Sequence, residues 1–251
     1  MSSLANLFIF MRAAKLVFVA CSAYGRIIAQ RVAYWMAGVA RDKYAVLYDL
    51  GYTTLPDYGG QHGWGSLLNN ALVYLFYALF LVGLFREYHC DARPLLKVLE
   101  NFLDGAVVVS VLGVMRSVAY TVTAVPTAWD MCRPENEAFR PPKRLIDVFS
   151  YGHVDIPGAD SCCGDMIFSG HMMSALSVAM YWVHFYGKEW YIPGVAMCLV
   201  QAYLIITSHA HYTVDVVIAW YITPMVWTLM VEKTSLFGAS VESRSSYAPV
   251  L

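Results

Sequence analysis

Long apolar segments dominate this chain and limit what it can fold into. Five of them stand out, at residues 66–85, 99–122, 172–186, 190–207 and 213–231. A helix needs about 20 apolar residues to cross a membrane, and only the segment at 172–186 falls clearly short of that. Charged residues make up 14% of the chain, where soluble domains have roughly 25%. The sequence therefore predicts an all-α, polytopic membrane protein with short connections.

The N-terminal region is harder to divide. Segments 4–19 and 18–39 are both mostly apolar, but each carries basic residues, among them Arg12, Lys15, Arg26 and Arg31. We interpret this region as one span that ends near Ala40 and is preceded by an interfacial segment. Six transmembrane helices result, and the loops before residues 170 and 212 then lie on the same face of the membrane.

Two short motifs, about forty residues apart, each begin one of these membrane-length segments. The first is Cys163-Gly164-Asp165-Met166-Ile167-Phe168-Ser169-Gly170-His171, and the second is His209-Ala210-His211-Tyr212-Thr213-Val214-Asp215. Six spans place His171 and His211 on one side, so the two histidines can share a site. A carboxylate at the start of a span is costly, and it indicates function rather than packing.

The spacing of the second motif suggests a chemical role. Residues at i and i+4 share a helix face, so Asp215 should accept a hydrogen bond from one nitrogen of His211. The other nitrogen keeps its lone pair and can act as a nucleophile, while His171 can supply a proton to a leaving group. We therefore expect His171, His211 and Asp215 to catalyse phosphoryl transfer on a lipid.

Residues around the triad are candidates for substrate binding. Gly170 allows a close backbone approach, and amides at the start of the next helix can bind an anion. Arg116 lies inside a span and must be paired. It either contacts the phosphate or bridges to Asp104, Asp165 or another buried group, and the sequence leaves this choice open.

Both motifs carry a family resemblance. Residues 163–171 and 209–223 resemble the last two catalytic motifs of sphingomyelin synthases and related ceramide phosphotransferases. Weaker similarities at 54–57 and 115–126 stand in the same order, and the resemblance covers roughly residues 40–230. It implies six spans and the triad of the lipid phosphate phosphatase superfamily, on His171, His211 and Asp215. Members transfer a phosphorylated head group from a glycerophospholipid donor to ceramide and release diacylglycerol.

The resemblance also bears on specificity. Met172, Ala210 and the pair Pro224-Met225 depart from the family pattern, which leaves the head group in doubt. We expect phosphocholine or phosphoethanolamine transfer, with phosphoinositol transfer or hydrolysis of the phospholipid as alternatives. Ile205 stands where phosphatases of the superfamily have an arginine, which favours a diester over a phosphomonoester dianion. The expected substrate contacts are Arg116, Asp165, Ser169, Gly170 and Glu137, the last by loose alignment with an acidic loop residue.

Other classes of function are less consistent with the sequence. The net charge of -1 gives no indication of nucleic-acid binding, and no group of residues has the spacing of a metal site, so no cofactor is expected. A lipid scaffold or transporter would leave the His–Asp pair structural, but transporters usually show internal repeats, and none is found here. The sequence does not decide whether the chain forms a homo-oligomer.

Charge and cysteine placement suggest the orientation. The face with the N-terminus holds eight Lys or Arg residues and the histidine face six, so a cytosolic N-terminus and a lumenal or exoplasmic site are favoured. We expect the Golgi or plasma membrane, and three parts: 1–40 with the first span, a catalytic transmembrane domain at 41–231 and a disordered cytosolic tail at 232–251. The loop position and the family resemblance predict a disulfide between Cys132 and Cys163, with Cys162 as the alternative partner.

Overall fold

A computed structural model describes residues 2–40, 46–58, 64–89, 94–127, 129, 132–133, 135–137, 139–150 and 163–233. Over these ranges the chain is helical, with turns and loops but no strand, which confirms the predicted all-α class. The helices are α1 (Ser2–Val39), α2 (Leu50–Thr54), α3 (Trp64–His89), α4 (Leu95–Val122), α5 (Asp147–Ser150), α6 (Gly170–Tyr186), α7 (Tyr191–Thr207) and α8 (Thr213–Trp227). A 3-10 turn (Lys188–Trp190) precedes α7, and a π-helical turn (Thr228–Lys233) continues α8.

Six long helices correspond to the six predicted spans. Five contain stretches long and apolar enough to cross a membrane: Ile9–Val39, Trp64–Arg86, Leu95–Val122, Lys188–Thr207 and Thr213–Val231. The sixth, α6, has 17 residues and is therefore about 25 Å long, slightly less than the apolar thickness of a bilayer. The predicted tail lies almost entirely outside the described residues, which end at 233.

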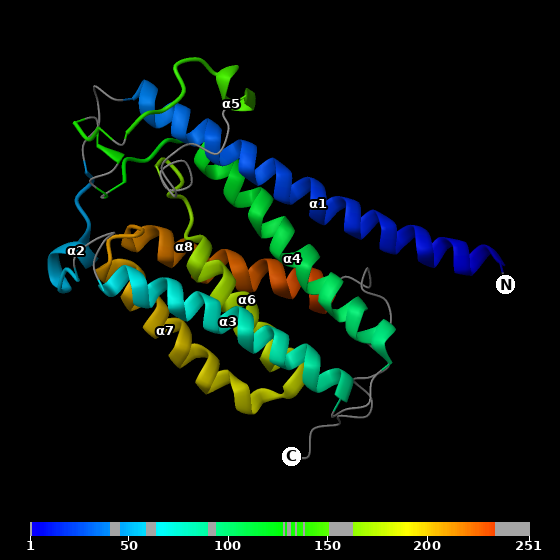
Figure 1. Ribbon diagram of the computed structural model, residues 1–251. Helices are drawn as coiled ribbons and strands as arrows, with labels where there is room; N and C mark the ends of the chain where they lie inside the picture. Colours follow the sequence, from blue (N-terminus) through cyan, green and yellow to red (C-terminus); the bar gives the residue numbers. More distant parts are fainter. Residues whose placement is uncertain are drawn as a thin grey trace.

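The N-terminal region differs from the prediction, because α1 is one continuous helix of 38 residues rather than an interfacial segment and a span. Arg12 and Lys15, which interrupt the apolar pattern, form ion pairs with Glu100 and Asp104 of α4. These carboxylates neutralise both cations along the contact between the helices, so the charges do not force the helix to end. Figure 1 shows α1 and α4 side by side.

Helix α6 lies at the centre of the bundle and packs against α3, α4, α7 and α8 (Figure 1). Most of its residues are buried, including Met172, Leu176 and Tyr181. The outward faces of the long helices expose large apolar side chains such as Leu67 and Ile192, as expected for surfaces that meet lipid. The helix that packs against four of the other long helices therefore carries His171 near its N-terminus.

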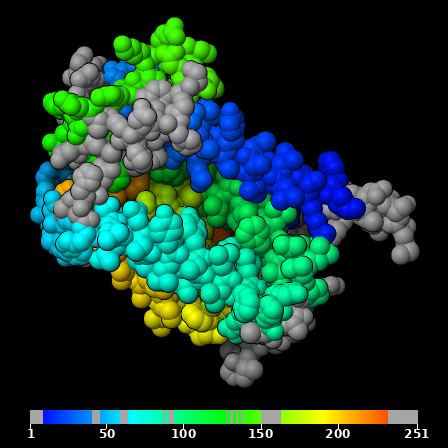
Figure 2. All heavy atoms as spheres, in the orientation of Figure 1, coloured from blue at the N-terminus to red at the C-terminus, as the bar shows by residue number. Residues whose placement is uncertain are grey.

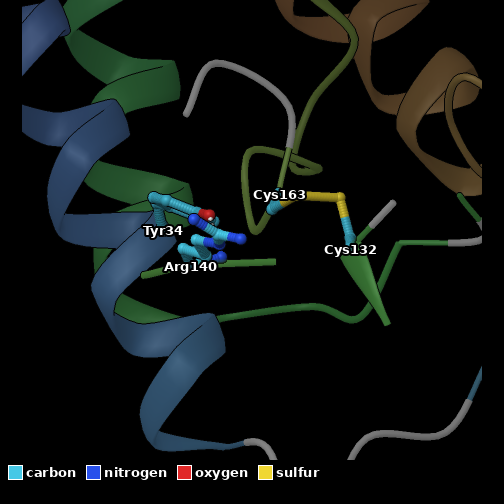
Figure 3. The surroundings of a disulfide bond; sticks show 4 residues. All are labelled: Tyr34, Cys132, Arg140 and Cys163. Atoms are coloured by element: carbon cyan, nitrogen blue, oxygen red, sulfur yellow. Dashed lines mark hydrogen bonds between the residues drawn. A yellow bond between two sulfur atoms is a disulfide. The ribbon is translucent and has the colours of Figure 1, made fainter. Parts of the chain in front are cut away.

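A disulfide joins the loop after α4 to the segment before α6. Cys132 and Cys163 are linked with a Cα–Cα distance of 5.4 Å, as predicted, whereas Cys162 lies outside the described residues. The bond packs beside α1, where the Tyr34 hydroxyl accepts a hydrogen bond of 2.8 Å from the backbone N–H of Arg140 (Figure 3). The disulfide thus anchors the segment that leads into the first motif.

Gly164, the next residue, needs to be glycine for two reasons. Its φ of +87° is in the left-handed region, and a Cβ there would lie 2.6 Å from the carbonyl oxygen of Ala33 in α1. The segment between Cys163 and Asp165 can therefore approach the backbone of α1 closely. This contact and the disulfide fix where the first motif begins.

We predict that removing this disulfide lowers stability without disturbing the six helices. Cross-linking two positions 31 residues apart should contribute about 3–4 kcal/mol by restricting the unfolded chain. The double substitution Cys132→Ser and Cys163→Ser should therefore lower the thermal unfolding temperature in detergent, with helicity by circular dichroism unchanged. The control is Cys21→Ser, which removes an exposed free thiol. Equal unfolding temperatures for the double variant and the control would contradict the prediction.

Candidate active site

His211 is held in place by a backbone carbonyl and a carboxylate. Its Nδ1 lies 3.1 Å from the carbonyl oxygen of Met166, in the first motif, and 3.5 Å from Oδ2 of Asp215. Both neighbours are acceptors, so Nδ1 carries the hydrogen and the lone pair of the neutral ring is on Nε2. The side chain is buried, yet it lines a cavity. The predicted contact with Asp215 is present, but the shorter contact is to Met166.

The route by which Asp215 reaches His211 also differs from the expectation of a shared helix face. His211 precedes Tyr212, the N-cap of α8, so it is outside the helix. Asp215 is in the first turn, and its Oδ2 accepts a hydrogen bond of 3.1 Å from the backbone N–H of Tyr212. The carboxylate therefore folds back over the helix N-terminus, where a negative charge is favoured, and meets the imidazole there.

His171, the second residue of α6, faces His211. The centroids of the two rings are 6.3 Å apart and the rings are inclined at 66°. Nε2 of His171 lies 3.1 Å from the side-chain oxygen of Asn70 in α3. Sequence reasoning did not identify Asn70, because a single amide in an apolar span gives no signal of its partner. The two rings thus form an edge-to-face pair, and both line the same cavity.

Arg116 acts as a clamp on the loop that precedes α6. Its Nε donates a hydrogen bond of 2.6 Å to the carbonyl of Phe168, and its Nη2 lies 2.8 Å from Oδ1 of Asp165. Both charged side chains are buried, and Gln30 of α1 donates a further hydrogen bond of 3.1 Å to Asp165. Burial raises the pKa of the Asp165 carboxyl above its ordinary value, and Arg116 and Gln30 counteract that rise. The sequence did not decide between Asp104, Asp165 and the phosphate as the partner of Arg116, and in the structure Arg116 forms an ion pair with Asp165.

Three further predicted residues have positions that bear on their roles. Ser169 is buried as the N-cap of α6, where its hydroxyl accepts from the N–H of Met172, and its own N–H donates to the carbonyl of Asp215. Gly170 packs against the Arg116 guanidinium, since a Cβ there would lie 3.2 Å from its central carbon. Glu137 is exposed in the loop after α4 and is not among the residues that line the cavity around the histidines.

A second set of contacts fixes the start of α8, and sequence reasoning missed it. Asp49, just before α2, accepts hydrogen bonds of 2.8 and 2.7 Å from the backbone N–H and hydroxyl of Thr213. The Tyr212 hydroxyl donates to the carbonyl of Pro126 and accepts from the N–H of Leu47. Tyr212 and Thr213, which lie between His211 and Asp215, are thereby tied to two loops, the one before α2 and the one after α4.

The histidines open into a polar cavity of about 490 Å³ between α1, α3, α4 and α6. An apolar cavity of about 420 Å³ lies next to it, and the two share Arg26, Tyr77, Gly113 and Ser174 in their walls. Figure 2 shows the corresponding hollow in the surface between α3, drawn in cyan, and α1 with α4, drawn in blue and green. A molecule with a polar head and apolar chains matches this pair of cavities.

Fold and site together define an integral membrane protein with paired histidines in a polar cavity at one end of a helical bundle. Residues 162–233 match the family described as PAP2 superfamily C-terminal. The chain is 31% identical over 188 residues to phosphatidylinositol:ceramide inositolphosphotransferase of Oryza sativa subsp. indica, a match that covers 72% of this chain and 55% of the relative. It is 31% identical over 109 residues to phosphatidylcholine:ceramide cholinephosphotransferase 2 of Homo sapiens, which covers 41% of this chain and 30% of the relative.

Residues 162–233 therefore form a domain of the PAP2 superfamily, and the chain is homologous to ceramide phosphotransferases, as the motifs predicted. It spans about half the length of the rice relative that it matches. The domain described as PAP2 superfamily C-terminal contains all three triad residues, and the longer match to the rice protein extends well beyond that domain.

We predict that the Arg116 clamp contributes strongly to stability. Arg116→Met would leave the Asp165 carboxylate buried without its cation, and breaking such a pair typically costs about 3–5 kcal/mol. The double substitution Arg116→Met and Asp165→Asn removes both charges and should recover part of that loss. Chemical unfolding in detergent measures both. The control, Arg144→Met, breaks an exposed ion pair with Asp147 and should change stability little. A double variant less stable than the single one would contradict this view of the pair.

Proposed function

We propose that this chain transfers a phosphorylated head group from a glycerophospholipid to ceramide and releases diacylglycerol. The observation that carries the proposal is the arrangement of His171 and His211, which face each other across one polar cavity. One ring nitrogen of His211 is held by the Met166 carbonyl, so the other is available to attack. The homologues named as ceramide phosphotransferases support the same reaction class.

In the first step, Nε2 of His211 attacks the phosphorus of the donor, and the bond between phosphorus and the diacylglycerol oxygen breaks. His171 gives its proton to that oxygen, so diacylglycerol leaves as a neutral alcohol. The head group remains on His211 as a phosphohistidine diester. The ring gains positive charge as the N–P bond forms, and the nearby Asp215 carboxylate stabilises it.

In the second step, the primary hydroxyl of ceramide takes the place of diacylglycerol. His171, now neutral, removes the hydroxyl proton, and the oxygen attacks phosphorus while the N–P bond breaks. His211 returns to its starting state and His171 is protonated again, so the cycle consumes no further reagent. Water could enter instead of ceramide and would complete a hydrolysis, the alternative reaction. An apolar cavity beside the site favours ceramide, because its walls suit acyl chains.

The lining of the polar cavity bears on which head group is transferred. The polar cavity is lined by four hydroxyl or amide side chains, Gln30, Ser66, Asn70 and Ser174, and by two aromatic rings, Tyr77 and Trp129. The first set suits the hydroxyls of inositol, whereas two rings can bind a choline through cation–π contacts. Similarity to inositolphosphotransferases extends over more of this chain than similarity to the human choline enzyme. We therefore propose phosphoinositol as the first head group to test and phosphocholine or phosphoethanolamine as the second.

We further propose that the site faces the lumen or the exterior, in the Golgi or the plasma membrane. The excess of basic residues on the opposite side and the disulfide beside the site support this orientation, since disulfides persist in oxidising compartments.

We predict that His211→Ala abolishes head-group transfer, with at least about a thousandfold lower turnover, because it removes the nucleophile. The matched control is His209→Ala. His209 is two residues away, its ring stacks on Tyr52 at 4.1 Å, and it does not line the polar cavity. Both variants are compared as purified protein in liposomes with fluorescent ceramide. Loss of activity in the control alone would remove His211 from the mechanism.

The reaction class is tested by product identity. Purified protein receives fluorescent ceramide and one donor at a time: phosphatidylinositol, phosphatidylcholine, phosphatidylethanolamine or phosphatidic acid with the same acyl chains. The proposal predicts a new phosphorylated sphingolipid from at least one diester, in an amount equal to the diacylglycerol released. Rapid hydrolysis of phosphatidic acid that is unaffected by ceramide would replace the transferase with a phosphatase.

A further inference from the structure

Arg26 of α1 is the one residue with a positive charge that lines both the polar and the apolar cavity, among the residues that the structure describes. It lies well inside the apolar stretch Ile9–Val39. A cation within a span is costly unless an anion or water accompanies it, so such a residue calls for a partner. Arg12 and Arg116, which also lie within long helices, have such partners in Glu100 and Asp165.

The Arg26 guanidinium has neither a hydrogen bond nor a carboxylate partner within the part of the chain that the structure describes. Its backbone carbonyl accepts a hydrogen bond of 3.4 Å from the Tyr120 hydroxyl, which fixes the helix but leaves the side chain free. Asp165, the carboxylate among the described residues of the cavity wall, is already engaged by Arg116 and Gln30. The cation of Arg26 is therefore uncompensated.

The charge of the polar cavity leads to the same point. Over the described residues, its walls contain three formally charged side chains, Arg26, Arg116 and Asp165. Arg116 and Asp165 neutralise each other, so Arg26 supplies the one positive charge of the cavity that neither a carboxylate nor the proton-transfer step uses. A phosphodiester group has one negative charge, which the Arg26 guanidinium can neutralise.

We propose that Arg26 binds the phosphodiester group of the donor lipid, an inference that rests on the proposed function and assigns the phosphate contact to a residue outside both motifs. A lipid with its head in the polar cavity and its chains in the apolar one has its phosphate where the two cavities meet. Arg26 is at that junction, together with Tyr77 and Ser174, whose hydroxyls are 3.2 Å apart. A guanidinium can bind two phosphate oxygens at once, so it would orient the phosphate as well as attract it.

This assignment changes the role expected for Arg116. The sequence left open whether Arg116 touches the phosphate, but its Nε and Nη2 are committed to the loop before α6. The phosphate-binding charge then comes from α1, the helix that carries neither catalytic motif. Any shift of α1 relative to α4 would move that charge relative to the histidines.

The test measures lipid binding without turnover. Full-length protein carrying His211→Ala is reconstituted in nanodiscs, and binding of fluorescent phosphatidylinositol is compared with binding of diacylglycerol that has the same labelled chain. Adding Arg26→Gln should weaken phosphatidylinositol binding about 10- to 100-fold, the usual range for a lost charged hydrogen bond, and should leave diacylglycerol binding unchanged. Arg26→Lys should retain most of the phospholipid affinity, since it keeps the charge.

The matched control is the double substitution Arg12→Gln and Glu100→Gln, which removes a paired cation from the same helix and should affect neither ligand. If Arg26→Gln weakened the binding of both lipids equally, Arg26 would have a packing role. If it weakened the binding of neither lipid, the phosphate would lie elsewhere. Either result would overturn the proposal. The two proposals can fail separately. If the wild-type protein bound phosphatidylinositol through Arg26 but transferred no head group, the proposed reaction would be wrong and the binding site would stand.

Discussion

The ion pair between Arg116 and Asp165 is the interaction on which the site depends. Arg116 reaches from α4 to the loop before α6 and binds it at Asp165 and Phe168. Met166 lies between these two points, and its carbonyl orients His211. The clamp therefore sets the position of both histidines, one through a carbonyl contact and the other through the start of α6. A buried pair is an expensive way to fix a loop, but its geometry is specific.

The sequence predicts the architecture well because the signals involved are local. A span is recognised from its own length and apolarity, so all six helices could be placed, and the two motifs gave the residues that the structure brings together at one end of the bundle. The chain's one misread helix, α1, is instructive. Arg12 and Lys15 interrupt the pattern within the helix, and only their partners Glu100 and Asp104, almost ninety positions away, explain why the helix continues.

The contacts that sequence could not predict are those between distant elements. Asn70 beside His171 and Asp49 beside Thr213 are ordinary polar residues until the fold brings them to the site. The relation of His211 to Asp215 was predicted from helical spacing, yet the two meet across the N-terminal turn of α8, because the helix begins one residue after the N-cap Tyr212. The spacing predicted the contact between His211 and Asp215, but the shared helix face from which it was predicted does not exist, because His211 lies outside α8.

The measurement that tests the account most directly is isolation of the covalent intermediate. Protein is incubated with a donor phospholipid without ceramide, quenched at alkaline pH, where phosphohistidine is stable, and digested for mass spectrometry. The account predicts that the peptide containing His211 gains the mass of the phosphorylated head group, and that added ceramide removes it. An unmodified His211 peptide under conditions where ceramide and donor together give product, or a modification on His171 instead, would contradict it.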